Sequence, residues 1–367
     1  MLRRMAKAYR AILTNFHKPL SPIITFVAIL LLRLLVAAGM LLDRLFIHSI
    51  SRQIITKPIV IVGNPRSGTT FLQRFLVDRN IGAGMQLWKM IFPALTLQKL
   101  FKPLLPMMEK MSPARFHAHA AHETNLSAIE TDDPLFLFHF FDGFFVYGFF
   151  LAWLREDVRA DFDPAVRDTS TRDFEWLEKV WKRNLIGERQ HQIIAKLFSL
   201  SVRIPQFLTH FPDAKILYTV RDPLETVPSG LSLVTGVLDG RFGFWNLPED
   251  KRTCYIDRLY RALLELTLRF HEDYMNGKIP KENVFIVRYD QMMNDFDGIM
   301  QKICAFIGMD VTPALRESIQ KTSESQRHYK SKHQYDLAKF GLTKDIIRKD
   351  YDKIYKSFLN TDYTMNS

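Results

Sequence analysis

The sequence predicts an α/β fold in which a central parallel sheet is flanked by helices, with a further hydrophobic helix near the N-terminus. Three short apolar runs, Pro58–Val62, Ala214–Val220 and Val284–Tyr289, have the length and composition of buried strands. Longer stretches with helical periodicity lie between them, including Arg172–Leu185 and Lys251–Tyr274. Short apolar strands separated by helical runs pair in parallel and are covered by helices, which predicts a three-layer arrangement.

The composition indicates a globular protein of enzyme size. With 367 residues, 47% of them hydrophobic, the chain can bury one large core or two smaller ones. The net charge of +11 favours anionic partners, but the basic residues are spread along the chain, so we do not expect nucleic-acid binding. The two cysteines, Cys254 and Cys304, provide neither a disulfide framework nor a metal-binding cluster. We therefore expect no metal site.

Residues 1–53 form a basic and hydrophobic segment that we separate from a domain at 54–367. The first twenty residues hold five Lys or Arg residues and no acid, and an apolar stretch from Pro22 to Leu42 follows, interrupted by Arg33. This stretch is long enough to cross a bilayer. A central arginine disfavours insertion, so an interfacial helix or a core helix remains an alternative to a spanning one. Basic residues on both flanks leave the orientation open.

The segment Pro134–Leu154 is unusually aromatic. A buried helix or a pair of packed segments would account for this composition. The alternative is an apolar wall for a lipid-like ligand, or a second membrane contact.

The loop after the first strand carries the clearest chemical signal. Residues Gly63–Thr70 read GNPRSGTT and lead into a helical pattern at Thr69–Asp78. A strand, a loop and a helix in this order direct backbone N–H groups and a helix dipole at an anion, so we expect phosphate or sulfate binding. Nucleotide triphosphatases need a lysine where this chain has Thr69, and the basic group here is Arg66 instead. The candidate ligand contacts are Asn64, Pro65, Arg66, Ser67, Gly68, Thr69 and Thr70.

A second candidate anion site follows the second strand. Arg221 comes directly after the strand, and Ser229 follows eight residues later on a helical pattern. A dianionic phosphate favours a guanidinium together with a hydroxyl donor, and a strand-turn-helix brings two such groups together.

These two elements together resemble the donor site of the PAPS-dependent sulfotransferases, where PAPS is 3′-phosphoadenosine-5′-phosphosulfate. The string GNPRSGTT resembles the family's 5′-phosphosulfate loop, and Arg221 with Ser229 resembles its 3′-phosphate site. The resemblance covers Lys57–Leu342 and is closest to the bacterial-type and tyrosylprotein-type enzymes. It implies a P-loop-like fold and transfer of a sulfuryl group from PAPS to a hydroxyl or amine, without a metal.

The resemblance also implies nucleotide contacts near the C-terminus. Tyr289 ends the third predicted strand, and the family's equivalent of the 327–342 tail folds over the nucleotide. We therefore expect Tyr289, Arg327 and Lys330 to contact the donor. A solvated basic loop is the alternative for the tail.

For catalysis, Arg66 is expected to neutralise the leaving phosphate oxygen. The acceptor must lose a proton, and candidate bases cluster at residues 117–133. Glu130 is the first candidate, His122 the second and Asp132 the third, although a turn or a surface cluster would also explain these residues. Lys196 occupies a place where the family often has a lysine, but the proline or histidine that commonly follows is missing.

We expect the acceptor to be a small-molecule or lipid-like compound, hydrophobic or resident in a membrane. The protein is expected at a membrane, on the cytoplasmic face because the donor is made in the cytosol, or else free in the cytoplasm. Two rival functions stay open. One is a P-loop phosphotransferase, and the other is a catalytically inactive, membrane-associated nucleotide-binding protein. The sequence does not indicate an oligomeric state.

Overall fold

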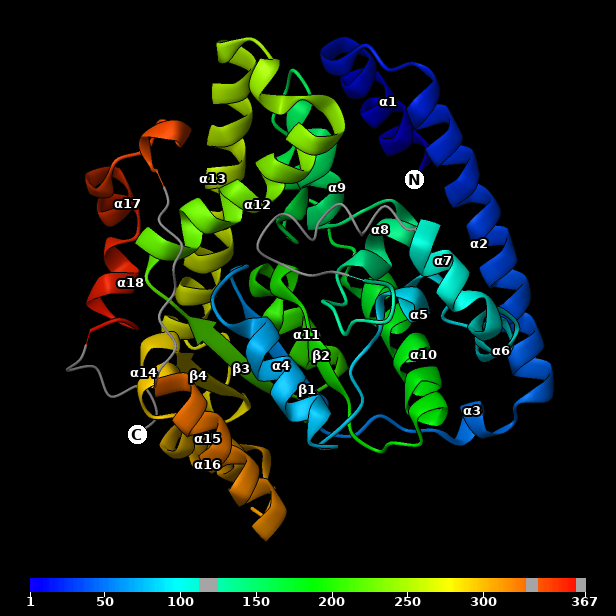
Figure 1. Cartoon of the computed structure of the whole chain (residues 1–367), viewed down its shortest axis with the longest axis vertical. Coiled ribbons are helices and arrows are strands. Elements are labelled where there is room, and N and C mark those ends of the chain that lie inside the picture. Colours follow the sequence, from blue (N-terminus) through cyan, green and yellow to red (C-terminus); the bar gives the residue numbers. More distant parts are fainter. Residues whose placement is uncertain (112–124, 328–335, 361–367) are drawn as a thin grey trace.

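The centre of the molecule is a parallel sheet of four strands in the order β2-β1-β3-β4 (Figure 1). The structure is a computed structural model and describes residues 1–111, 125–327 and 336–360. The strands are β1 (Ile59–Gly63), β2 (Ile194–Lys196), β3 (Lys215–Val220) and β4 (Val284–Arg288). The three predicted strands are confirmed, whereas β2 was missed because three residues are too few to show a period.

The strands are apolar on both faces, and each face carries its own core. In β1, the side chains of Ile59 and Ile61 enter one core, while those of Val60 and Val62 enter the other. This alternation continues in the neighbouring strands. A sheet that is buried on both sides needs helices on both sides, so the three-layer prediction is confirmed.

The helices divide between the two faces of the sheet. Those that pack against the core of Ile59 and Ile61 are α4 (Thr69–Asp78), α14 (Tyr289–Asn294), α15 (Phe296–Ile307) and α16 (Pro313–Arg327). Those that pack against the larger opposite core include α10 (Ser170–Glu188), α11 (Ile204–His210), α12 (Pro223–Phe242), α13 (Glu249–Met275), α17 (Lys344–Asp350) and α18 (Asp352–Lys356).

The remaining elements complete the described chain, and several of them contribute side chains to the larger core. The α-helices are α1 (Leu2–Phe16), α2 (Leu20–Phe46), α3 (Ser49–Arg52), α5 (Leu87–Ile91), α6 (Leu95–Phe101), α7 (Leu105–Met111), α8 (Pro134–Phe140) and α9 (Phe144–Phe149). The short 3₁₀ helices are η1 (Lys102–Leu104), η3 (Leu151–Trp153), η4 (Arg159–Phe162), η5 (Phe198–Val202), η6 (Phe244–Asn246), η7 (Lys281–Asn283) and η8 (Ala338–Phe340).

The aromatic segment predicted at 134–154 is a pair of packed segments. A bend of 77° separates α8 from the continuous stretch of α9 and η3. Gly143 lies at this bend with φ of 84°, a conformation that side chains disfavour. The bend brings aromatic side chains from both helices toward the carboxyl ends of the strands.

The N-terminal helix α2 is longer than the apolar stretch that predicts it. It runs along one edge of the molecule beside α1 and α6 (Figure 1). Within the described ranges, α2 is the one unbroken helix that is long and apolar enough to cross a membrane. The division of the chain into residues 1–53 and 54–367 stays a prediction.

The strand order creates a switch point between β1 and β3. From β1 the chain continues to β2 on one side, and β3 is added on the other side. In open α/β sheets, ligands bind outside the carboxyl ends of the strands at such a point. The two loops that carry the predicted anion sites follow β1 and β3, so the fold brings them to the same place.

Candidate active site

The loop between β1 and α4 is held by close packing at its two glycines. Gly63 has φ of 142°, and a Cβ atom there would lie 2.4 Å from the Thr219 hydroxyl oxygen on β3. Gly68 has φ of 93°, and a Cβ atom there would lie 2.7 Å from the ring of Tyr289. Arg66 between them has φ of 74°, which is uncommon for a residue with a side chain. Both glycines are therefore required by the space around the loop.

Two polar side chains of the loop face the protein interior. The Ser67 hydroxyl donates to the Asn64 carbonyl at 2.7 Å and lies 2.6 Å from the Thr219 hydroxyl. The Asn64 amide donates to the Leu263 carbonyl at 3.1 Å. These bonds fix the backbone of the loop just before α4 begins at Thr69. A helix N-terminus presents unpaired N–H groups and a positive dipole end, which favours an anion at this position.

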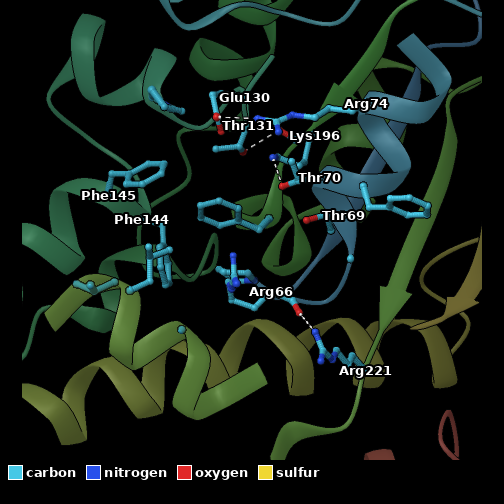
Figure 2. Close-up of a pocket in the computed structure, with 18 of the residues that line it drawn as sticks. Arg66, Thr69, Thr70, Arg74, Glu130, Thr131, Phe144, Phe145, Lys196 and Arg221 are labelled. Atoms are coloured by element: carbon cyan, nitrogen blue, oxygen red, sulfur yellow. Dashed lines mark hydrogen bonds and ion pairs between the residues drawn. The ribbon is translucent and has the colours of Figure 1, made fainter. Parts of the chain in front are cut away.

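The two predicted anion sites are in direct contact. Arg66 Nε donates to the Ser229 hydroxyl at 2.9 Å. Arg221 Nη1 donates to the Arg66 carbonyl at 3.1 Å, and Figure 2 shows this bond joining the two segments. The Arg221 guanidinium also lies 4.0 Å from the centroid of the Tyr289 ring and pairs with Glu225. The segments that follow β1 and β3, together with α12 and α14, thus form one cationic site.

A cavity of about 820 Å³ opens beside this cationic site. One part of its lining is polar and comes from the loop, α4 and the strand ends, and the other part is aromatic and aliphatic. The polar lining includes Arg66, Thr69, Thr70, Arg74, Glu130, Thr131, Lys196 and Arg221. The apolar lining includes Leu137, Phe138, Phe144, Phe145, Phe149, Phe198, Leu231, Val234, Leu259 and Leu263. A cavity of this size and composition suits an organic ligand with one charged and one apolar end.

Lys196, at the end of β2, lies at the polar wall of the cavity. Its ammonium group donates to the Thr70 hydroxyl at 2.9 Å (Figure 2). Burial lowers the pKa of Lys196 to about 8, while the nearby Glu130 carboxylate acts in the opposite direction. An amine with this pKa can give up a proton near neutral pH, and such perturbed groups are common at active sites.

Of the predicted base candidates, Glu130 is the one among the described residues that line the cavity. Its side chain is nearly buried, and its carboxylate lies 3.5 Å from Arg74 Nη2 on α4. Figure 2 shows Glu130, Arg74, Lys196 and Thr70 directed toward the same region. His122 lies outside the described residues.

The two aspartates after Glu130 belong to the protein interior. Trp181 Nε1 donates to Asp132 Oδ2 at 3.0 Å, and burial raises the pKa of Asp132 to about 8. The Asp133 carboxylate accepts from the backbone N–H groups of Phe198 and Ser199 at 3.1 and 3.2 Å. Neither side chain lines the cavity. Their contacts hold η5 and α10 in place.

The structure brings most of the predicted donor contacts together. Those that line the cavity are Pro65, Arg66, Gly68, Thr69, Thr70, Arg221 and Tyr289. Ser229 adjoins it through its hydrogen bond with Arg66, whereas the side chains of Asn64 and Ser67 face the protein interior. Arg327 ends α16, but its side chain and all of Lys330 lie outside the described part of the chain.

Arg74 and Phe198 line the cavity but were not predicted as site residues from the sequence. Arg74 lies one helical turn after Thr70 on α4, and this spacing could have identified it because residues four apart share a helix face. Phe198 follows β2, which was itself not predicted. In residues 1–111, 125–327 and 336–360, no group of three or more His, Cys, Asp or Glu side chains could hold a metal ion.

The comparison with known proteins agrees with the geometry of the site. The model of the sulfotransferase family matches residues 58–313. The fold is similar to that of sulfotransferase STF9 from Mycobacterium avium, with a TM-score of 0.66, 17% identity, and coverage of 90% of this chain and 83% of that one.

It is also similar to that of sulfotransferase STF1 from Mycobacterium tuberculosis, with a TM-score of 0.65, 18% identity, and coverage of 95% and 90%. No curated protein sequence matches the chain. The family match begins at β1, includes the loop, Arg221 and Ser229, and extends over more than half of the chain. The chain therefore belongs to the sulfotransferase family.

Proposed function

We propose that this sulfotransferase takes the sulfuryl group from PAPS and transfers it to a hydroxyl or amine of a hydrophobic acceptor. The observation that carries the proposal is the contact between Arg66 and Arg221, because it joins the loop after β1 to the site after β3. PAPS carries anionic groups at both its 5′ and 3′ positions, and two adjacent anion sites match this pattern. An ATP-dependent enzyme would not need the second site.

The residues present suit the donor. The loop 64–68 and the start of α4 would hold the 5′-phosphosulfate through backbone N–H groups and the Thr69 and Thr70 hydroxyls. Arg221 and Ser229 would hold the 3′-phosphate. The ring of Tyr289, which already stacks under Arg221, would lie beside the nucleotide. The bond from Arg66 to Ser229 shows that the two sites are within reach of one arginine side chain.

The polar wall of the cavity supplies groups for the transfer. Glu130 would accept the proton of the acceptor as the new oxygen–sulfur or nitrogen–sulfur bond forms. The bond between sulfur and the donor's phosphate oxygen breaks, which leaves 3′-phosphoadenosine-5′-phosphate. Arg66 and the protonated Lys196 would stabilise the negative charge on that oxygen. An arginine and a lysine supply here the positive charge that magnesium supplies to triphosphates, so no metal is required.

The apolar half of the cavity supports a hydrophobic acceptor. Phe144, Phe145 and Phe149 from α9 and Phe198 from η5 line it. A lipid-like molecule would bury its apolar part here while its nucleophile faces Glu130. The exposed apolar surface of α2 supports membrane association, and cytosolic PAPS would favour the cytoplasmic face.

Calorimetric binding of 3′-phosphoadenosine-5′-phosphate to wild type, Arg66→Ala and Arg221→Ala tests the donor assignment. We expect binding that depends on the 3′-phosphate and weakens at least tenfold in each variant, with ATP and AMP as control ligands. Equal binding of AMP would refute a PAPS donor. Tight, magnesium-dependent ATP binding would favour the phosphotransferase alternative, and nucleotide binding without turnover of any acceptor would favour the inactive protein.

A further inference from the structure

Helix α2 presents an apolar face that the rest of the described chain leaves uncovered. At 100° per residue, the exposed apolar positions between Leu20 and Leu42 cover about half of the helix circumference. They are Leu, Ile, Val and Ala residues, and Thr25, which lies outside this arc, is the one exposed polar residue in the same range. Ile24, Leu31 and Leu34 are 67%, 61% and 69% exposed. A soluble protein rarely exposes an apolar surface of this extent, so it marks an interaction site.

The opposite face of α2 is fixed to the body along the length of the helix. Pro22, Ile29, Val36 and Asp43 are buried at intervals of seven residues, which places them along one seam. Near one end of the seam, a Cβ atom on Gly39 would lie 2.6 Å from a side-chain carbon of Leu97 on α6.

A buried ion pair fixes the same end of α2. The Asp43 carboxylate accepts from the backbone N–H of Leu95 and from Arg183 Nε, both at 2.8 Å, and it is fully buried. Pulling α2 into a bilayer as a spanning helix would break this pair and leave a buried charge without its partner. The geometry therefore opposes a span, although the length of the helix would allow one.

The ends of the apolar face are cationic. Lys18 precedes the helix, and Arg44, Arg52 and Lys57 lie at and beyond its other end, all of them exposed, while the exposed Arg3 and Arg10 belong to the neighbouring α1. Asp43 is the single acidic residue among positions 1–57, and it is buried against Arg183. An apolar stripe with cationic ends is complementary to the headgroups and acyl chains of an anionic lipid surface.

Aromatic contacts connect α2 to the cavity. Phe26 on α2 packs against Phe141, whose ring lies 5.7 Å from that of Phe150. Phe150 in turn contacts Phe149, which lines the apolar half of the cavity. The exposed helix and the acceptor wall thus share one packed aromatic layer.

We propose that α2 lies flat in the surface of an anionic bilayer, with its apolar face inserted and its seam still bound to the body, so that the enzyme docks on one leaflet without crossing it. This inference deepens the membrane association proposed above and rests on it. A second copy of the chain is the competing occupant. The face is convex and covers about half the helix, whereas a partner helix would cover a narrower stripe.

Vesicle flotation tests the docking. Wild type should float with vesicles of phosphatidylglycerol and phosphatidylcholine and less with phosphatidylcholine alone. Leu31→Glu with Leu34→Glu should lower the apparent partition constant at least tenfold. Val166→Glu, a matched change at a residue that is 63% exposed on another surface, should leave it unchanged. Binding of 3′-phosphoadenosine-5′-phosphate by each variant reports whether it is folded, and it tests the donor site separately.

Spin-label depth separates a flat helix from a spanning one. Labels would be placed at Ile24, Leu31 and Leu45 in a Cys254→Ser background, because Cys254 is exposed while Cys304 is buried. A flat helix predicts similar, shallow depths at all three positions. A deep label at Leu31 with shallow labels at both ends would overturn the proposal. So would the absence of vesicle binding, or a dimer that dissociates in the Leu31→Glu and Leu34→Glu variant.

Discussion

The two halves of the cavity are built in different ways. The cationic half is made of main-chain geometry and hydrogen bonds around one continuous loop, in which Gly63 and Gly68 have no room for a side chain. The aromatic half is made of side chains from α8, α9, η5, α12 and α13, which pack by shape. Hydrogen-bonded charges depend on single atoms, whereas apolar contact is spread over many. Single substitutions should therefore have large effects on function in the cationic half and smaller, graded effects in the aromatic half.

Arg66→Ala should have the largest effect. Removing a cation that stabilises a developing charge costs about 10²- to 10³-fold in kcat, and we expect a loss of this order. Arg66→Lys is the matched control, and it should recover part of the activity because the charge remains. Steady-state kinetics with a sulfated product as readout would measure both. A loss below tenfold in the alanine variant would remove Arg66 from the transfer step.

Arg221→Ala should weaken nucleotide binding only through the loss of contacts to the 3′-phosphate. A charged hydrogen bond contributes about 1.5–3 kcal/mol, so affinity for 3′-phosphoadenosine-5′-phosphate should fall about 10- to 100-fold. Affinity for adenosine-5′-phosphosulfate, which lacks the 3′-phosphate, should change little. Glu225→Gln removes the carboxylate that pairs with Arg221 and should preserve or increase binding. Equal losses for both nucleotides would place Arg221 elsewhere.

The charge of Lys196 should set an alkaline limit on turnover. Because burial lowers its pKa to about 8, the ammonium group loses its proton as the pH rises through that value. If the protonated form stabilises the leaving oxygen, kcat should fall above about pH 8. In Lys196→Arg the side chain stays charged, so the alkaline fall in kcat should move to higher pH. If the fall in kcat occurs at the same pH in the variant, a group other than Lys196 causes it.

Phe145→Ala should have a moderate effect confined to the acceptor. Phe145 packs against Phe149 and Phe198 in the apolar half. Losing part of this contact should raise the KM for a hydrophobic acceptor about tenfold, with nucleotide affinity unchanged. Phe145→Leu keeps apolar volume and should have a smaller effect. A change in nucleotide affinity would mean that the two halves are coupled.

Asp132→Asn should have the smallest effect on activity and a clear one on stability. Burial raises the pKa of Asp132 to about 8 in the folded state, far above its value of 3.8 when exposed. The folded protein then binds more protons than the unfolded chain between these values, so its stability falls as pH rises through this range. Asparagine can still accept from Trp181 but cannot ionise. The Tm of the variant should depend less on pH between 5 and 8.

Thermal unfolding of Asp132→Asn beside wild type at several pH values would check this. Parallel curves for the two proteins would mean that another group controls the loss of stability as the pH rises. A large loss of activity in this variant would return Asp132 to the list of candidate bases.

Much of the cationic half could be predicted from the sequence, because short-range geometry determines it. The order of Gly, Pro, Ser and Thr around Arg66 predicts a tight loop at the end of a strand, and the helix at Thr69–Asp78 has the predicted bounds. Arg221 and Ser229 are close in the chain and share a strand-turn-helix. Local patterns of this kind depend on backbone conformation, which nearby residues control.

Tertiary packing decided the rest. The sequence could not show that Arg66 reaches Ser229, that Asp132 faces Trp181, or that Glu130 lines the cavity while Asp132 and Asp133 do not. Strand β2, the bend at Gly143 and the seam of α2 depend on contacts between residues about 50 to 140 positions apart. The sequence by itself determined the family, the strands β1, β3 and β4 and the loop at Gly63–Thr70, because these follow from local residue order. The direction of each side chain was decided only by the tertiary structure, because burial and partners come from distant parts of the chain.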